Sequence, residues 1–135
     1  MESVYLFRSM IDFGLVVLIW LVQLIIYPGF RFSDKSSFIP WHSKYMWLVS
    51  FVVAPLMLFQ LAIIIYQLSV FTHWYVILSL GLALLVWLVT FRFAVPIHNK
   101  LNEEGNKYTL VQNLVRINWI RTGAWTLIWL LGLLH

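Results

Sequence analysis

The chain has 135 residues, of which 62% are hydrophobic, 18% aromatic and only 10% charged, whereas an average soluble domain has roughly 25% charged residues. This composition is typical of a membrane protein, and the length allows one small domain over residues 1–135. The absence of cysteine excludes disulfides, thiolate metal sites and cysteine nucleophiles. The formal net charge of +4 provides no basic face in water, which excludes nucleic-acid binding.

Four apolar segments predict four membrane-spanning helices, at residues 12–27, 46–66, 74–95 and 117–134. A span needs about 20 mostly apolar residues, so the first and fourth segments must include flanking residues. We expect a single all-α domain, a polytopic membrane protein folded as a four-transmembrane-helix up-down bundle.

The N-terminal segment is interpreted as a retained helix, because Asp12 interrupts it and Tyr27-Pro28 is no small-residue cleavage site. Arg8 and Asp12 are four residues apart, so they can pair on one helix face. We expect that pair to lie near the membrane interface, with its side chains reaching toward the headgroups.

The basic residues predict an orientation in the membrane. With four spans, both termini lie on one side, and the loops at 29–40 and 97–112 lie on the other. Of the nine Lys and Arg residues, only Arg8 is on the side of the termini. The positive-inside rule therefore places both loops in the cytoplasm and both termini outside, in the cell (inner) membrane.

Prolines and turn residues predict where helices begin, bend and end. Pro40 suits the first turn of the second helix, and Pro55 is expected to kink that helix. Pro96 is expected to end the third helix, and residues 102–106 (NEEGN) have the composition of a turn.

Polar and aromatic side chains recur at helical spacing in the predicted cytoplasmic half of each helix. Because polar groups in lipid are costly unless they face one another or a wet cavity, these side chains should point inward. They predict a pocket open to the cytoplasm with an aromatic floor. The four sets are Trp20, Gln23 and Tyr27; His42 and Tyr45; Trp87, Phe91, Ala94 and His98; and Asn118, Arg121 (or Thr122) and Trp125.

The chemistry of these residues leaves several roles open. His42 and His98 suit general acid/base catalysis. As a metal site the pair is incomplete, because it lacks further ligands. The two histidines lie at a similar membrane level, as the axial ligands of a haem would. Arg121 has no acidic residue in reach. Its partner is a helix-end carbonyl, a lipid phosphate, a phenol of Tyr27 or Tyr45, or an anionic ligand. The alternative for each residue is structural: Asn, Gln, Ser and Thr often join membrane helices, and Trp and Tyr often form interfacial belts.

Three motifs together resemble the anthrone oxygenase-like family of small four-helix membrane proteins. They are residues 27–28 (YP), 96–101 (PIHNKL) and 118–122 (NWIRT). The opening of the second helix, residues 41–45 (WHSKY), is similar to uncharacterised bacterial membrane proteins. The resemblance implies that Asn99, Asn118 and Arg121 are pocket residues and that His98 accepts a proton. Characterised relatives oxidise polycyclic phenolic anthrones to quinones.

Three functions remain open from the sequence. The first is an oxygenase or oxidoreductase acting on a lipophilic aromatic or quinone-like molecule, with His98 or His42 as base and Arg121 with Asn99 or Asn118 stabilising an oxyanion. In that function Tyr27, Tyr45, Trp87 and Trp125 would complete the ligand-binding pocket. The second is a non-catalytic accessory or assembly subunit of a larger membrane complex, or of a homo-oligomer. The third is a protein that binds membrane lipid or haem; no cofactor is assigned.

Overall fold

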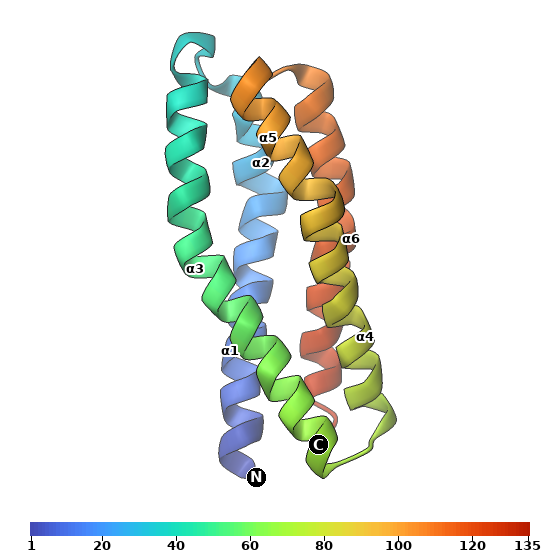
Figure 1. Ribbon diagram of the computed structural model, residues 1–135. Helices are drawn as coiled ribbons and strands as arrows, with labels where there is room; N and C mark the ends of the chain where they lie inside the picture. Colours follow the sequence, from blue (N-terminus) through green and yellow to red (C-terminus); the bar gives the residue numbers. More distant parts are fainter.

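The computed structural model describes residues 1–135 and contains helices but no strand. The chain forms four long helical rods that lie side by side (Figure 1). The first rod consists of α1 (Glu2–Leu21), the π-helical turn η1 (Val22–Ile26), α2 (Tyr27–Gly29) and the 3₁₀ turn η2 (Phe30–Phe32). The second is α3 (Lys35–Val70). The third joins α4 (Trp74–Val89), the π-helical turn η3 (Thr90–Ala94) and α5 (Val95–Glu104), and the fourth is α6 (Tyr108–Gly132).

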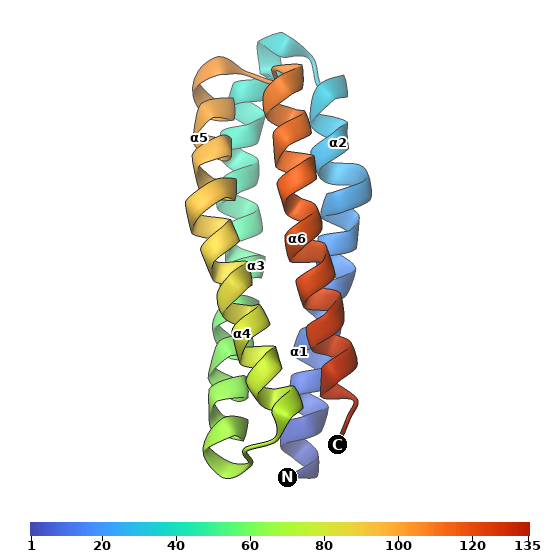
Figure 2. The same cartoon turned by 90° about the vertical axis from the view of Figure 1, so that its right-hand side faces the viewer.

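The rods alternate in direction, so the N- and C-termini lie at the same end of the molecule (Figures 1 and 2). The connections after η2 and after α5 lie together at the opposite end. The Asn106 amide joins them by donating to the carbonyl oxygens of Phe30 and Ser33, at 2.9 and 3.0 Å. Gly105 makes the second turn with φ of +84°, a conformation that costs little only for glycine.

Every predicted helix is longer in the structure than its apolar segment. The first begins at Glu2 rather than residue 12, the second at Lys35 rather than 46, and the fourth at Tyr108 rather than 117. The predicted loop over residues 97–112 is therefore mostly helix, with only residues 105–107 between α5 and α6. Apolarity identifies the part of a helix suited to lipid, whereas the backbone hydrogen bonds of a helix continue into polar sequence.

The prolines lie inside helical rods rather than at their ends. Pro96 does not end the third helix as predicted, because the π-helical turn before it widens the backbone and the helix continues to Glu104. Pro40 lies in the second turn of α3 rather than the first. The kink expected at Pro55 agrees with the bend of α3 about halfway along its length (Figure 1).

The core lies between the rods and is centred on α6, which packs against both α1 and α4. Many large apolar side chains face outward instead; Trp47 and Phe51 of α3 are 71% and 68% exposed. The helices Glu2–Phe32, Lys35–Val70 and Trp74–Glu104 are long and apolar enough to cross a membrane. The fourth, α6, is not among them, because it carries buried polar residues such as Asn118 and Arg121. These properties are consistent with a multi-pass membrane protein.

Candidate functional site

A cavity of about 160 Å³ lies between the rods, toward the end that holds the connecting turns. Most of its wall is aliphatic, with Leu18, Ile19, Val22 and Met57 among the lining residues. Its polar and aromatic lining residues are Tyr27, Tyr45, Ser50, Thr90, Phe91, His98, Arg121 and Trp125. The hydroxyls of Ser50 and Thr90 donate to carbonyls of their own helices, which leaves the phenols, the imidazole and the guanidinium to face a ligand.

A chain of hydrogen bonds leads from the cavity to the end of the molecule. The Tyr27 hydroxyl lies 3.0 Å from His98 Nε2, and His98 Nδ1 lies 2.9 Å from His42 Nε2. His42 Nδ1 lies 2.6 Å from Asn102 Oδ1, which also accepts a hydrogen bond from Ser43 at 3.2 Å. Both histidines are buried, while Ser43 is exposed. The chain therefore connects the cavity with the surface near the connecting turns.

The partners of this chain define where its protons sit. Asn102 Oδ1 can only accept, so His42 Nδ1 carries hydrogen. In a neutral imidazole, His42 Nε2 is then an acceptor, and it takes the hydrogen on His98 Nδ1. His98 Nε2 is left to accept from the Tyr27 hydroxyl. Both imidazole rings are thus neutral, and every hydrogen bond is donated in the direction from Tyr27 toward Asn102. Such a chain can move one proton along its length.

Arg121 is the only charged residue in the wall of the cavity. Its side chain is 6% exposed and makes one hydrogen bond, from Nη1 to Asn118 Oδ1 at 3.3 Å. Its Nε–H is buried with no partner, and neither of the two ion pairs in the structure includes it. The guanidinium carbon lies 5.1 Å from the Trp125 ring centre, close enough for a cation–π contact. A buried positive charge without a carboxylate favours an acceptor or anion beside it.

Local backbone structure positions Tyr27 and His98, which line the cavity on the side of the connecting turns. Pro28 and Pro96 each follow a π-helical turn, in which the N–H of Tyr27 bonds to the carbonyl of Val22 and that of Val95 bonds to Thr90. A proline has no N–H and its ring crowds the carbonyl four residues earlier. The wider π turn relieves that conflict without ending the helix. Tyr27 and His98 follow these turns and meet between the first and third rods.

Amide and hydroxyl side chains hold η1 and α6 together beside the cavity. Gln23 Oε1 accepts from the Asn118 amide and from the Thr122 hydroxyl, each at 2.9 Å, and Gln23 Nε2 donates to the Val115 carbonyl. Asn118 therefore positions Arg121 from behind rather than lining the cavity. This is the structural role that polar residues commonly have between membrane helices.

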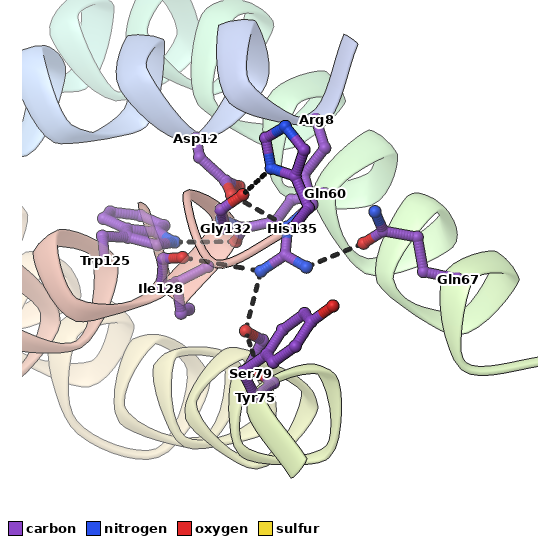
Figure 3. Close-up of polar contacts among 10 residues, drawn as sticks. All are labelled: Arg8, Asp12, Gln60, Gln67, Tyr75, Ser79, Trp125, Ile128, Gly132 and His135. Atoms are coloured by element: carbon purple, nitrogen blue, oxygen red, sulfur yellow. Dashed lines mark hydrogen bonds and ion pairs between the residues drawn. The ribbon is translucent and has the colours of Figure 1, made fainter. Parts of the chain in front are cut away.

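A second polar cluster lies near the termini (Figure 3). Arg8 and Asp12 pair at 3.1 Å as predicted, but they are 1% and 0% exposed, so their side chains do not reach outward as predicted. Arg8 also donates to Gln67 Oε1 and to the Ser79 hydroxyl, each at 2.7 Å, which joins three rods. The helices around this pair enclose it, so neither side chain can reach the surface.

This cluster is connected to the cavity through one glutamine. Gln60 donates to Asp12 Oδ1 at 2.7 Å and accepts from the Trp125 indole at 3.0 Å. Trp125 forms part of the cavity wall and lies beside Arg121. The buried carboxylate thus fixes the orientation of an aromatic ring in the candidate site (Figure 3).

The structure brings together most of the side chains that the sequence singles out. Tyr27, Tyr45, His98, Arg121 and Trp125 line the cavity, and His42 and Asn118 lie directly behind it. The other two predicted pocket residues do not reach it. Asn99 is exposed, and Trp87 stacks on Phe91 and packs on the core.

Several residues of these networks are missing from the sequence prediction. Asn102 falls in a segment that looks like a turn, although its spacing of four from His98 in a continued helix would have placed it on the same face. Gln60, Gln67 and Ser79 lie in the half of the molecule near the termini, where no polar cluster was predicted.

No protein-family model, curated protein or solved structure matches this chain.

Proposed function

We propose that this chain is a multi-pass membrane protein of four spanning helices that binds a lipophilic aromatic or quinone-like molecule in the cavity and exchanges a proton with it. The single observation that carries the proposal is the composition of the cavity wall. An apolar chamber contains one guanidinium without a carboxylate, beside a neutral hydrogen-bonded chain of one phenol and two imidazoles.

The residues support binding of a ligand oxygen. Arg121 can donate to a carbonyl, phenol or phenolate oxygen, and no hydrogen bond within the protein competes for its Nε–H. A hydrogen bond to a charged group contributes about 1.5–3 kcal/mol, which corresponds to roughly 10- to 100-fold in affinity. The rings of Tyr27, Tyr45 and Trp125 suit a flat aromatic face.

The hydrogen-bonded chain supports proton transfer at the same place. A phenolic ligand would donate its proton to the Tyr27 oxygen while the Tyr27 hydrogen moves to His98 and the His98 hydrogen to His42. Arg121 would stabilise the phenolate that forms. Because a phenolate is oxidised more readily than a phenol, this step suits an oxygenase or oxidoreductase, as the resemblance to the anthrone oxygenase-like family implies. In the orientation we propose, with the connecting turns in the cytoplasm, the proton leaves on the cytoplasmic side.

Haem between the two histidines fits the geometry less well. Two metal–nitrogen bonds of about 2.0–2.1 Å each require the ligating nitrogens to be about 4 Å apart, whereas His42 Nε2 and His98 Nδ1 are 2.9 Å apart. The remaining nitrogens are bonded to Asn102 and Tyr27. The two histidines are therefore positioned to hydrogen-bond to each other rather than to ligate a shared iron.

Mass spectrometry of small molecules that co-purify with the detergent-solubilised protein tests the proposal. The wild type is expected to carry an aromatic or quinone-like molecule, and Arg121→Met is expected to carry clearly less of it and to bind it with roughly tenfold or greater loss of affinity. Arg116→Met is the matched control, because Arg116 is exposed on the same helix. Wild-type protein that carries no such molecule and binds no added phenol or quinone would refute the proposal. If Arg121→Met instead fails to fold or loses a partner protein, the residue is structural and the accessory-subunit alternative is favoured.

A further inference from the structure

We propose that the ligand is a single-ring phenol or quinone whose hydrocarbon tail leaves the cavity sideways, between α3 and η3, so that it enters from the lipid rather than from water. This inference rests on the proposed function and deepens it by specifying the size of the ring, the presence of a tail and the route of entry.

The cavity volume sets the number of rings. A cavity of about 150 Å³ in another protein accommodates one benzene molecule, and this one measures about 160 Å³. One six-membered ring with its oxygens fills that space. The three fused rings of an anthrone exceed it, so the substrate class implied by the family resemblance does not fit the cavity as it stands.

The unpartnered polar groups show where the ring oxygens would bind. No hydrogen bond within the protein reaches the Tyr45 hydroxyl, and the Nε–H of Arg121 has no acceptor. Arg121 is more than nine-tenths buried, so its charge is directed at the interior of the cavity rather than at solvent. A single cation beside two phenols suits one neutral or singly charged ring oxygen. A doubly charged phosphate would need more positive charge than this wall supplies.

The cavity is open at its side. All of its lining residues that are exposed at the outer surface belong to α3 or η3, namely Ser50, Ala54 and Phe91. Helix α3 contributes no buried residue between His42 and Met57, so this stretch covers the cavity without packing tightly on the other rods. Met46, Val49 and Val53 line the same side. The opening is therefore apolar and lies on a flank of the bundle.

The end of the cavity near the connecting turns is closed. Phe30 and Phe38 are 0% exposed and pack against each other and against His42. A ligand from water would have to displace these rings and the histidine pair. A ligand in the hydrocarbon layer meets only the flank between α3 and η3, and a tail left in that layer keeps its apolar surface out of water.

The experiment blocks the side opening and compares two probes that share one ring. The probes are a benzoquinone with a ten-carbon chain and the same ring with a methyl group, and binding to detergent-solubilised protein is measured by quenching of tryptophan fluorescence. Ala54→Trp and Ser50→Trp each place a large side chain in the opening. Val52→Trp is the matched control, because Val52 is 53% exposed on the same stretch and does not line the cavity.

Both opening variants are expected to weaken binding of the chain-bearing quinone at least tenfold and to change binding of the methyl form less than twofold. Val52→Trp should bind both probes as the wild type does. Because each variant is compared with the wild type in the same micelles, partitioning of the chain into detergent cancels. Gel filtration and circular dichroism confirm that the variants fold; if one does not, the other decides.

Unchanged binding of the chain-bearing probe in folded opening variants would overturn the route through α3 and η3 while leaving the proposed function intact. A three-ring anthrone that binds as tightly as the single-ring probes would overturn the ring size. If the wild type binds none of these molecules, the proposed function itself fails.

Discussion

Replacing Arg8 with methionine tests the most deeply buried positive charge in the protein. The substitution keeps a long apolar side chain but removes the donors to Asp12, Gln67 and Ser79. Asp12 then remains 0% exposed, with Gln60 as its one hydrogen-bond donor. Breaking a buried ion pair on one side costs about 3–5 kcal/mol, and an orphaned neutral acceptor such as Gln67 Oε1 costs about 1–3 kcal/mol by itself. We expect Arg8→Met to lower the free energy of unfolding by about 3–5 kcal/mol.

The assay is unfolding in mixed micelles by increasing mole fraction of SDS, followed by far-ultraviolet circular dichroism. The combined replacement of Arg8 with Met and Asp12 with Leu should recover most of the loss, because removing both ions leaves no buried charge in this cluster. Lys107→Met is the control: it breaks an exposed ion pair with Glu104, which contributes about 0–1 kcal/mol. If Arg8→Met costs no more than Lys107→Met, the Arg8–Asp12 pair is solvated at an interface and the reasoning is wrong.

Three further outcomes are expected. Gly132→Val should destabilise the protein by about 1–3 kcal/mol, because a Cβ at Gly132 would lie 3.3 Å from the buried carboxylate of Asp12. Gly123→Val is the control, because a Cβ at Gly123 would have nothing within 4 Å, and it should be nearly neutral in the same SDS titration. Gln60→Leu should lower the free energy of unfolding by about 1–3 kcal/mol, because it leaves a carboxylate oxygen of Asp12 and the indole N–H of Trp125 unpaired. Gln112→Leu, at an exposed position, should lower it by less than about 0.5 kcal/mol. In nitrogen-15 NMR of histidine-labelled protein at neutral pH, His98 should be protonated on Nδ1, and an Nε2-protonated ring would contradict the proposed direction of the chain.

The periodicity of the sequence predicts the convergence of side chains at one end of the molecule. The pairs Tyr27 with His98 and His42 with His98 come from different rods, yet each residue lies on the face that its apolar neighbours leave for the interior. The prediction succeeds here because polar side chains on an apolar membrane helix must point toward other polar groups inside the protein rather than toward lipid.

The depth and the ends of the helices could not be predicted in the same way. Arg8 flanks a short apolar segment, which suggests an interface, and nothing in its local sequence reveals that Gln67 and Ser79 from other rods surround it. Asn102 was missed because its neighbours favour a turn. In the structure the π-helical turn before Pro96 lets the helix continue far enough to place Asn102 against His42. Both errors concern long-range packing, which a single sequence does not encode locally.

The two π-helical turns also set the register that holds the hydrogen-bonded chain together. A π turn holds one residue more than an α turn, so converting it to α-helix shifts the register and rotates all that follows by about 100°. Tyr27 lies just beyond η1, and His98 lies just beyond η3. A register shift in either rod would therefore turn one partner away from the other, and it would also bring back the backbone conflict at Pro28 or Pro96 that the wider turn relieves. The Tyr27–His98 contact therefore depends on both π-helical turns, one in each of the two rods.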